Sequence, residues 1–92
     1  MKTLRRRRSR TGVIVDLLSE ALNGANKTRL MYRCNLNFGQ FNRYLDEFLS
    51  ADLIECDYSI QGDAYPYKVY KTTEKGRRLL KVLRRANELL SI

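Results

Sequence analysis

The segment NFGQFNRYLDEFLSA, residues 37–51, most constrains the fold, because it reads as an amphipathic helix with a defined beginning. At about 100° per residue, its apolar side chains fall on one wide stripe. The stripe consists of Phe38, Phe41, Tyr44, Leu45, Phe48 and Leu49. Asn37 can cap the helix, and Gln40 follows at the spacing of a capping box. The helix must therefore pack one face against other elements, and its polar face is either simply hydrated or a contact surface.

Two helical patterns precede this segment. Residues 11–23 carry apolar side chains at helical spacing and are followed by an Asn-Gly stop. A shorter helix begins at Asn26 or Thr28 and ends near Cys34. Asn35 tolerates the left-handed backbone conformation that lets one helix end and the next begin at a steep angle. A short helix, a tight turn and a longer amphipathic helix predict a helix-turn-helix.

The hydrophobic period changes after this pair of helices. Residues 54–60 alternate apolar and polar side chains, as in a half-buried strand, and residues 61–64 read as a turn. Residues 65–72 are rich in Tyr, Val and Thr and are expected to return as the second strand of a β-hairpin. Thr73 is expected to cap a last helix that continues to about Leu90. The order of elements is that of a winged helix-turn-helix domain.

The predicted fold class is therefore α+β, mainly α: a winged helix-turn-helix with a three-helix core, a β-hairpin wing and a C-terminal helix for dimerisation. Residues 1–10 are expected to be a flexible basic arm, residues 11–72 the winged helix-turn-helix domain, and residues 73–92 the dimerisation element. Apolar residues of the last helix hold a coiled-coil spacing. The expected dimer contacts are Leu79, Leu83, Ala86 and Leu90. The alternative is a monomer that folds these residues onto its own first helix.

Composition restricts the function. The 92 residues carry a formal charge of +8, which favours polyanionic partners, and they contain no histidine. Without a glycine-rich phosphate loop or a nucleophile beside a general base, the sequence argues against an enzyme, a metal site or a cofactor. No segment approaches the roughly 18 apolar residues that span a membrane. Cys34 and Cys56 are expected to be small buried residues with free thiols in a reducing cytoplasm.

Double-stranded DNA is the expected partner, because the second helix of a helix-turn-helix enters the major groove. Side chains on the first turns of residues 37–51 have the geometry to contact base edges. The predicted base-reading residues are Asn37, Gln40, Asn42 and Arg43. Gly39 would let the backbone approach the duplex. Asp46 and Glu47 would be repelled by phosphates, so this half of the helix is expected to tilt away or be neutralised by neighbouring basic groups.

Other basic and polar residues are expected to contact the DNA backbone. Around the start of the first helix of the pair these are Lys27, Thr28, Arg29 and Arg33, in the wing Lys68, and in the arm Arg5, Arg6, Arg7 and Arg8. For the arm, a hydrated tail that contributes only charge is an equally good interpretation.

Three segments resemble the small archaeal winged-helix DNA-binding proteins of the ArnR-like type, which include chromatin-associated dimers. They are KTRLMYRCNL at residues 27–36, RYLDEFLSADLIE at residues 43–55 and YKTTEKGRRLL at residues 70–80. The resemblance implies that residues 27–29 and the exposed side of residues 37–43 face DNA, and that the last helix forms an antiparallel dimer. Two departures from the chromatin type are a last helix of only about two heptads and the basic arm.

The function predicted from the sequence is that of a DNA-binding transcriptional regulator in the cytoplasm, associated with the nucleoid. One alternative is an architectural, weakly sequence-specific chromatin protein in which the arm dominates binding. Another is a protein-interaction module, because winged helices also serve as docking domains.

Overall fold

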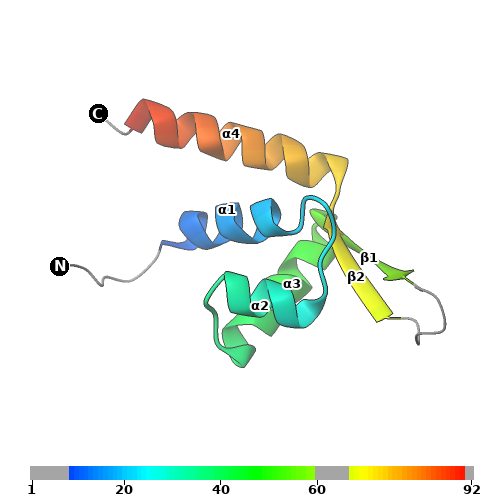
Figure 1. Ribbon diagram of the computed structural model, residues 1–92. Helices are drawn as coiled ribbons and strands as arrows, with labels where there is room; N and C mark the ends of the chain where they lie inside the picture. Colours follow the sequence, from blue (N-terminus) through cyan, green and yellow to red (C-terminus); the bar gives the residue numbers. More distant parts are fainter. Residues whose placement is uncertain (1–8, 60–66, 91–92) are drawn as a thin grey trace.

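Helices and strands follow one another in the expected order. The computed structural model describes residues 9–59 and 67–90, which contain α1 (Arg10–Glu20), α2 (Lys27–Arg33), α3 (Phe38–Ser50), β1 (Ile54–Ser59), β2 (Tyr67–Thr72) and α4 (Glu74–Leu90) (Figure 1). None of the described helices is long and apolar enough to cross a membrane.

The beginnings of the helices are set by local hydrogen bonds. Each cap residue offers a side-chain oxygen to the backbone N–H three positions further on, at 2.8 to 3.0 Å, and the caps are Ser9, Asn26, Asn37 and Thr73. Because Ser9 caps α1, the helix begins at Arg10, the last residue of the predicted arm. The expected cap and capping box at Asn37 are confirmed.

The two turns after α2 and α3 use left-handed residues. Asn35 has a φ of 54°, as predicted for the tight turn between α2 and α3, and Asp52 has a φ of 61° between α3 and β1. The helix-turn-helix expected from the sequence is therefore formed by α2 and α3.

The wing is an antiparallel hairpin in which Ile54 pairs with Thr72 and Ser59 with Tyr67. The expected turn at residues 61–64 lies outside the described residues. Ala25 extends the sheet on the other side of β2, because its N–H donates to the Tyr70 carbonyl at 3.0 Å and its own carbonyl accepts from the Tyr70 N–H at 2.8 Å. This pairing explains why α1 ends at Glu20, before the expected residue 23: the chain must straighten to reach β2.

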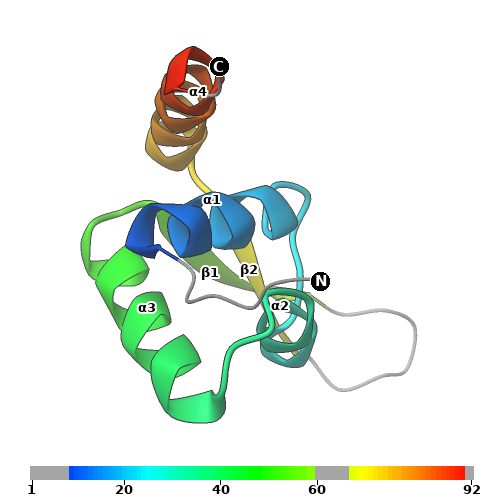
Figure 2. The same cartoon turned by 90° about the vertical axis from the view of Figure 1, so that its left-hand side faces the viewer.

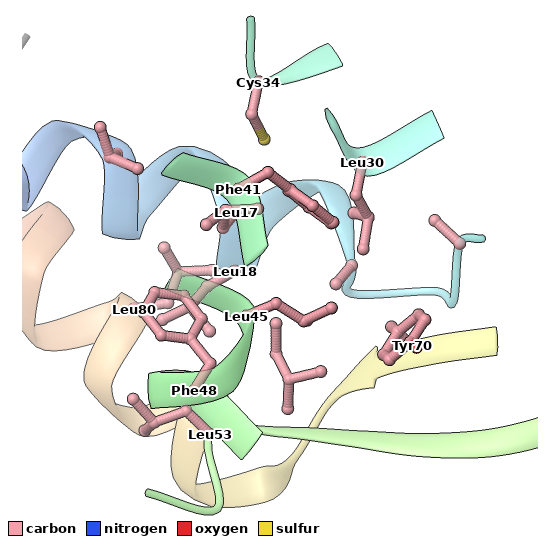
Figure 3. Packing of buried hydrophobic residues seen from close by; sticks show 14 residues of the cluster. Leu17, Leu18, Leu30, Cys34, Phe41, Leu45, Phe48, Leu53, Tyr70 and Leu80 are labelled. Carbon is pink, nitrogen blue, oxygen red and sulfur yellow. The ribbon is translucent and has the colours of Figure 1, made fainter. Parts of the chain in front are cut away.

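The core lies between α1, α3 and the base of the hairpin (Figure 3). Leu17 and Leu18 of α1 meet Phe41 of α3 there, and all three are fully buried. Leu30 of α2 and Leu80 of α4 close the cluster from other sides. The core thus draws on every described helix, as expected for a single domain.

Several apolar expectations are wrong, and they include Leu49 and Tyr58, which are exposed although the sequence places them on the apolar faces of α3 and β1. Phe38 was expected on the buried stripe of α3, but 68% of it is exposed, because it lies a turn before Phe41, beyond the reach of the core. Cys56 was expected to be buried, but it is exposed, because β1 is the outer strand of the hairpin and leaves the core after Ile54, whereas β2 still buries Tyr70 opposite Cys56. Cys34 is buried as expected, and neither cysteine is in a disulfide.

Helix α4 lies across α1, on the side opposite to α2 and α3 (Figures 1 and 2). Only its first half is packed: Gly76 and Leu80 are buried, and Leu79 is partly buried against the core. Further along, Arg84 donates a 2.8 Å hydrogen bond to the Ser19 hydroxyl of α1. From Arg84 onward, the side chains of α4 are exposed.

Candidate nucleic-acid interface

The first turns of α3 form the exposed part of the helix-turn-helix. Asn37, Gly39, Gln40 and Arg43 are exposed, and Asn42 is half-buried. Figures 1 and 2 place α2 and α3 at the end of the molecule away from α4. A long, straight molecule such as a DNA duplex can therefore approach α3 without meeting α4.

Two of the predicted base-reading residues already have a structural role. The Asn37 Oδ1 atom accepts the Gln40 N–H at 2.8 Å, and the Gln40 Oε1 atom accepts the Asn37 N–H at 3.4 Å. A bidentate contact of Gln40 with adenine needs both its oxygen and its nitrogen. Gln40 must therefore give up a long, weak hydrogen bond to read a base in that way, whereas the amide nitrogens of both residues remain available as donors.

The helical period divides the exposed residues of α3 into two edges. Phe38 and Asn42 are one turn apart on one edge, and Gly39 and Arg43 are one turn apart beside them. Gln40 lies about 160° around the helix from Asn42. The exposed ridge of α3 thus runs in steps of about 40° to 60° through Asn42, Gly39, Arg43 and Gln40, and Phe38 lies at its edge beside Asn42.

The acidic half of α3 is neutralised in part. The Arg10 Nη2 atom of α1 donates to the Glu47 Oε1 atom at 2.8 Å, and the Arg10 guanidinium carbon lies 5.6 Å from the centre of the Tyr44 ring. The expectation that a basic group neutralises this acidic pair is confirmed for Glu47. No sequence pattern indicated Arg10 as the residue responsible, because the two partners are 37 positions apart.

The expected phosphate-contacting residues that the structure describes are exposed on α2 and β2. Lys27, Thr28 and Arg29 occupy the first turn of α2 and are exposed, as is Arg33 at its last residue. The backbone N–H of Arg29 is already bonded to the Asn26 side chain, which leaves its guanidinium rather than its amide for a phosphate. Lys68 is exposed on β2. Arg5, Arg6, Arg7 and Arg8 lie outside the described residues.

The predicted dimer residues of α4 divide into two groups. Leu79 and Leu83 are partly buried against their own chain, which matches one part of the monomeric alternative. Ala86 and Leu90 are exposed. The structure also exposes 63% of Val82 and 64% of Leu89, which the sequence had assigned only to a wider apolar surface. The exposed apolar stripe therefore consists of Val82, Ala86, Leu89 and Leu90.

No three His, Cys, Asp or Glu side chains gather as a metal site within residues 9–59 and 67–90. The functional geometry of the described residues is instead a helix pair joined by a tight turn, with a hairpin behind it, which defines a winged helix-turn-helix domain.

The chain belongs to the winged helix-turn-helix family, whose model matches residues 7–91. This match confirms the fold class: three helices, a hairpin wing and a C-terminal helix. No curated protein matches the sequence.

Two solved structures are similar. One is Sso10a-2, a DNA-binding protein from Sulfolobus solfataricus, with 22% identity and a TM-score of 0.68 over 89% of this chain and 81% of that chain. The other is a PadR family transcription regulator from Clostridium difficile R20291, with 21% identity and a TM-score of 0.72 over 86% of this chain and 91% of that chain. At these identities the similarity establishes the fold.

Proposed function

We propose that the protein is a transcriptional regulator without enzymatic activity that binds double-stranded DNA by inserting the first turns of α3 into the major groove. The observation that carries this proposal is the exposed ridge on a capped helix, on which the Arg43 side chain makes no hydrogen bond or ion pair to any other described residue. An arginine without a partner among the described residues can offer its whole guanidinium to a guanine edge.

Charge and the comparisons support the same proposal. The formal charge of +8 attracts a polyanion, and Lys27, Thr28, Arg29, Arg33 and Lys68 are exposed for phosphate contacts. One similar structure is described as a DNA-binding protein and the other as a transcription regulator. Membership of the archaeal ArnR-like type and a nucleoid location belong to the same proposal.

We further propose that the protein acts as a homodimer through α4. Val82, Ala86 and Leu89 follow one another at spacings of four and three residues, which is the pattern of a coiled-coil contact. A second copy with the same stripe would bury these side chains symmetrically. Because α4 lies opposite α3, the dimer would leave both α3 helices open to successive half-sites on one duplex.

Selection from random duplexes at two salt concentrations tests the proposed function. We expect a preferred sequence at both concentrations, with weaker binding at the higher one. Replacing Arg43→Ala should cost about 1 to 3 kcal/mol on the selected site and relax the preference at one base pair. Arg85→Ala is the matched control, because Arg85 is exposed on α4, far from α3. An equal loss for Arg43→Ala on selected and random DNA would contradict base reading.

An architectural chromatin protein is the second candidate, favoured by the four consecutive arginines at residues 5–8. A chain that begins at Ser9 distinguishes the two functions. A large and uniform loss of binding indicates the architectural protein, whereas a retained sequence preference indicates the regulator. Failure to bind any duplex at low salt would contradict both functions and favour a protein-interaction module.

A further inference from the structure

Phe38 is a large apolar side chain on the surface that we propose for DNA. It is the first residue of α3 and 68% of it is exposed. A single exposed apolar residue is common on protein surfaces and needs no explanation. Phe38 differs from such residues in its position, because it lies on the same edge of α3 as Asn42, one turn before it.

The position of Phe38 is fixed by the helix cap. Asn37 precedes Phe38 in the sequence and Gln40 follows it, and the two hydrogen bonds between Asn37 and Gln40 hold the first turn of α3 in place. Gly39 adds no side chain that could keep the helix away from a surface. If the first turns of α3 enter the major groove, the exposed Phe38 enters on the edge of the helix that it shares with Asn42.

The chemistry of the groove limits what Phe38 can contact. A phenyl ring has no N–H or O–H group to donate a hydrogen bond, so its most favourable contact in the groove is with an apolar group. The apolar group on base edges in the major groove is the methyl at C5 of a pyrimidine, which thymine carries and unmodified cytosine lacks.

We propose that Phe38 is a specificity-determining residue that packs against the C5-methyl group of a pyrimidine in each half-site. This inference rests on the proposed function and deepens it by naming a contact that the sequence pattern had assigned to the core. Burying one methyl group corresponds to about a fourfold gain in affinity. Phe38 thus adds selectivity for thymine over cytosine next to the bases read by Asn42 and Arg43.

The test uses the duplex selected with the full chain. Each thymine is replaced in turn by deoxyuridine, which lacks only the methyl group. We expect one position per half-site at which the wild-type protein loses about fourfold in affinity. The Phe38→Ala variant should bind the thymine and deoxyuridine duplexes equally. At the same position, cytosine is compared with 5-methylcytosine: a gain from that methyl group as well assigns any C5-methyl, and no gain assigns thymine alone.

Two controls separate this contact from a loss of folding or of general affinity. Because Phe38 lies outside the core, the melting temperature of Phe38→Ala should match that of the wild type. Tyr32→Ala removes another exposed aromatic side chain, 82% exposed on α2, and should keep the response to deoxyuridine.

The outcomes also distinguish this inference from the proposed function. Sequence-selective binding that is unaffected by deoxyuridine at every position overturns the role of Phe38 and leaves the regulator intact. The role of Phe38 is also overturned, and the regulator left intact, if Phe38→Ala still loses affinity when thymine is replaced by deoxyuridine. Absence of any duplex binding overturns the proposed function and this inference together.

Discussion

The Arg10 guanidinium of α1 lies 2.8 Å from the Glu47 carboxylate of α3, and both side chains remain partly open to solvent. The ion pair connects the beginning of α1 to the second half of the helix that we propose for DNA. It reduces the repulsion that Glu47 would exert on a nearby phosphate. The free energy of unfolding gains little from such an exposed pair, about 1 kcal/mol at most.

This ion pair predicts opposite effects on DNA affinity at its two ends. Glu47→Gln should increase affinity at low salt, because it removes a negative charge and releases Arg10. Arg10→Ala should decrease affinity, because it leaves Glu47 unneutralised. Duplex titrations at two salt concentrations measure both effects. If Arg10→Ala costs as much affinity in the Glu47→Gln background as in the wild type, Arg10 contacts DNA directly instead of acting through Glu47.

The cap of α3 allows stability and DNA affinity to be changed separately. Asn37→Asp keeps a side-chain acceptor for the Gln40 N–H, so the free energy of unfolding should be preserved. The new negative charge should nevertheless weaken duplex binding. Asn37→Ala should lose about 1 kcal/mol of stability. Urea unfolding and duplex titration of both variants check this, with Asn37→Ser as the neutral control that keeps the cap. Unchanged binding by Asn37→Asp would place Asn37 away from the duplex.

Gly39 of α3 and Gly76 of α4 should respond oppositely to alanine. A Cβ atom at Gly76 would collide with the Leu53 carbonyl oxygen and the Thr72 side chain, so Gly76→Ala should cost about 1 to 3 kcal/mol of stability. At Gly39 the nearest atom to a new Cβ is the Asn37 Oδ1 at 3.7 Å, an ordinary contact. Gly39→Ala should therefore stabilise the protein by up to about 1 kcal/mol.

Gly39→Ala should also weaken DNA binding despite its greater stability, because we propose that the backbone approaches the duplex at this residue. Thermal unfolding and duplex titration are measured on the same samples. Equal or tighter binding by Gly39→Ala would show that the backbone does not come close to the duplex there.

The proposed dimer predicts a variant that is monomeric but folded. Leu89→Lys places a charge in the exposed apolar stripe of α4, far from the core, so it should shift the protein to monomers without unfolding it. Asn87→Lys adds the same charge to another face of α4 and should leave the dimer intact. Sedimentation velocity measures the oligomeric state of each protein. A wild-type protein that sediments as a monomer at high concentration would contradict the dimer.

The raised pKa of the Tyr70 phenol predicts that the protein loses stability at alkaline pH. Burial raises the pKa of its phenol above the ordinary value of 10.0, and the neighbouring Cys56 and Tyr58 raise it further. Because the folded state holds this proton more tightly than the unfolded state, the contribution is fully present below pH 10 and is lost as the pH rises through the folded pKa. Urea unfolding below and above this pH should show a smaller decrease for Tyr70→Phe than for the wild type. An identical decrease would exclude Tyr70 as its source.

Local signals in the sequence were sufficient for the order of elements. The cap at Asn37, the left-handed Asn35 and the change of hydrophobic period after α3 each involve residues within about four positions of one another. Interactions over such short distances are determined almost entirely by the neighbouring residues. For this reason the helix-turn-helix, the hairpin and the last helix were predicted from the sequence, with only small shifts at the ends of α1.

The tertiary structure decided which apolar residues the core covers. Hydrophobic periodicity tells which side chains share a face, but not how far the partner surface extends along it. Phe38 and Cys56 continue buried faces past the point where the core ends, and they are exposed. Leu79 begins an apolar face of α4 that the core covers only at its start.

The tertiary structure also produced contacts between distant residues. Arg10 meets Glu47 and Gly76 lies against Leu53 because α1 and α4 pack beside the segments that contain those partners. No pattern in the sequence encodes such pairs, since their positions follow from the packing of whole helices. The sequence by itself thus determined that α3 is a capped amphipathic helix, and its packing in the fold left Phe38 and Arg43 open to solvent and paired Glu47 with Arg10.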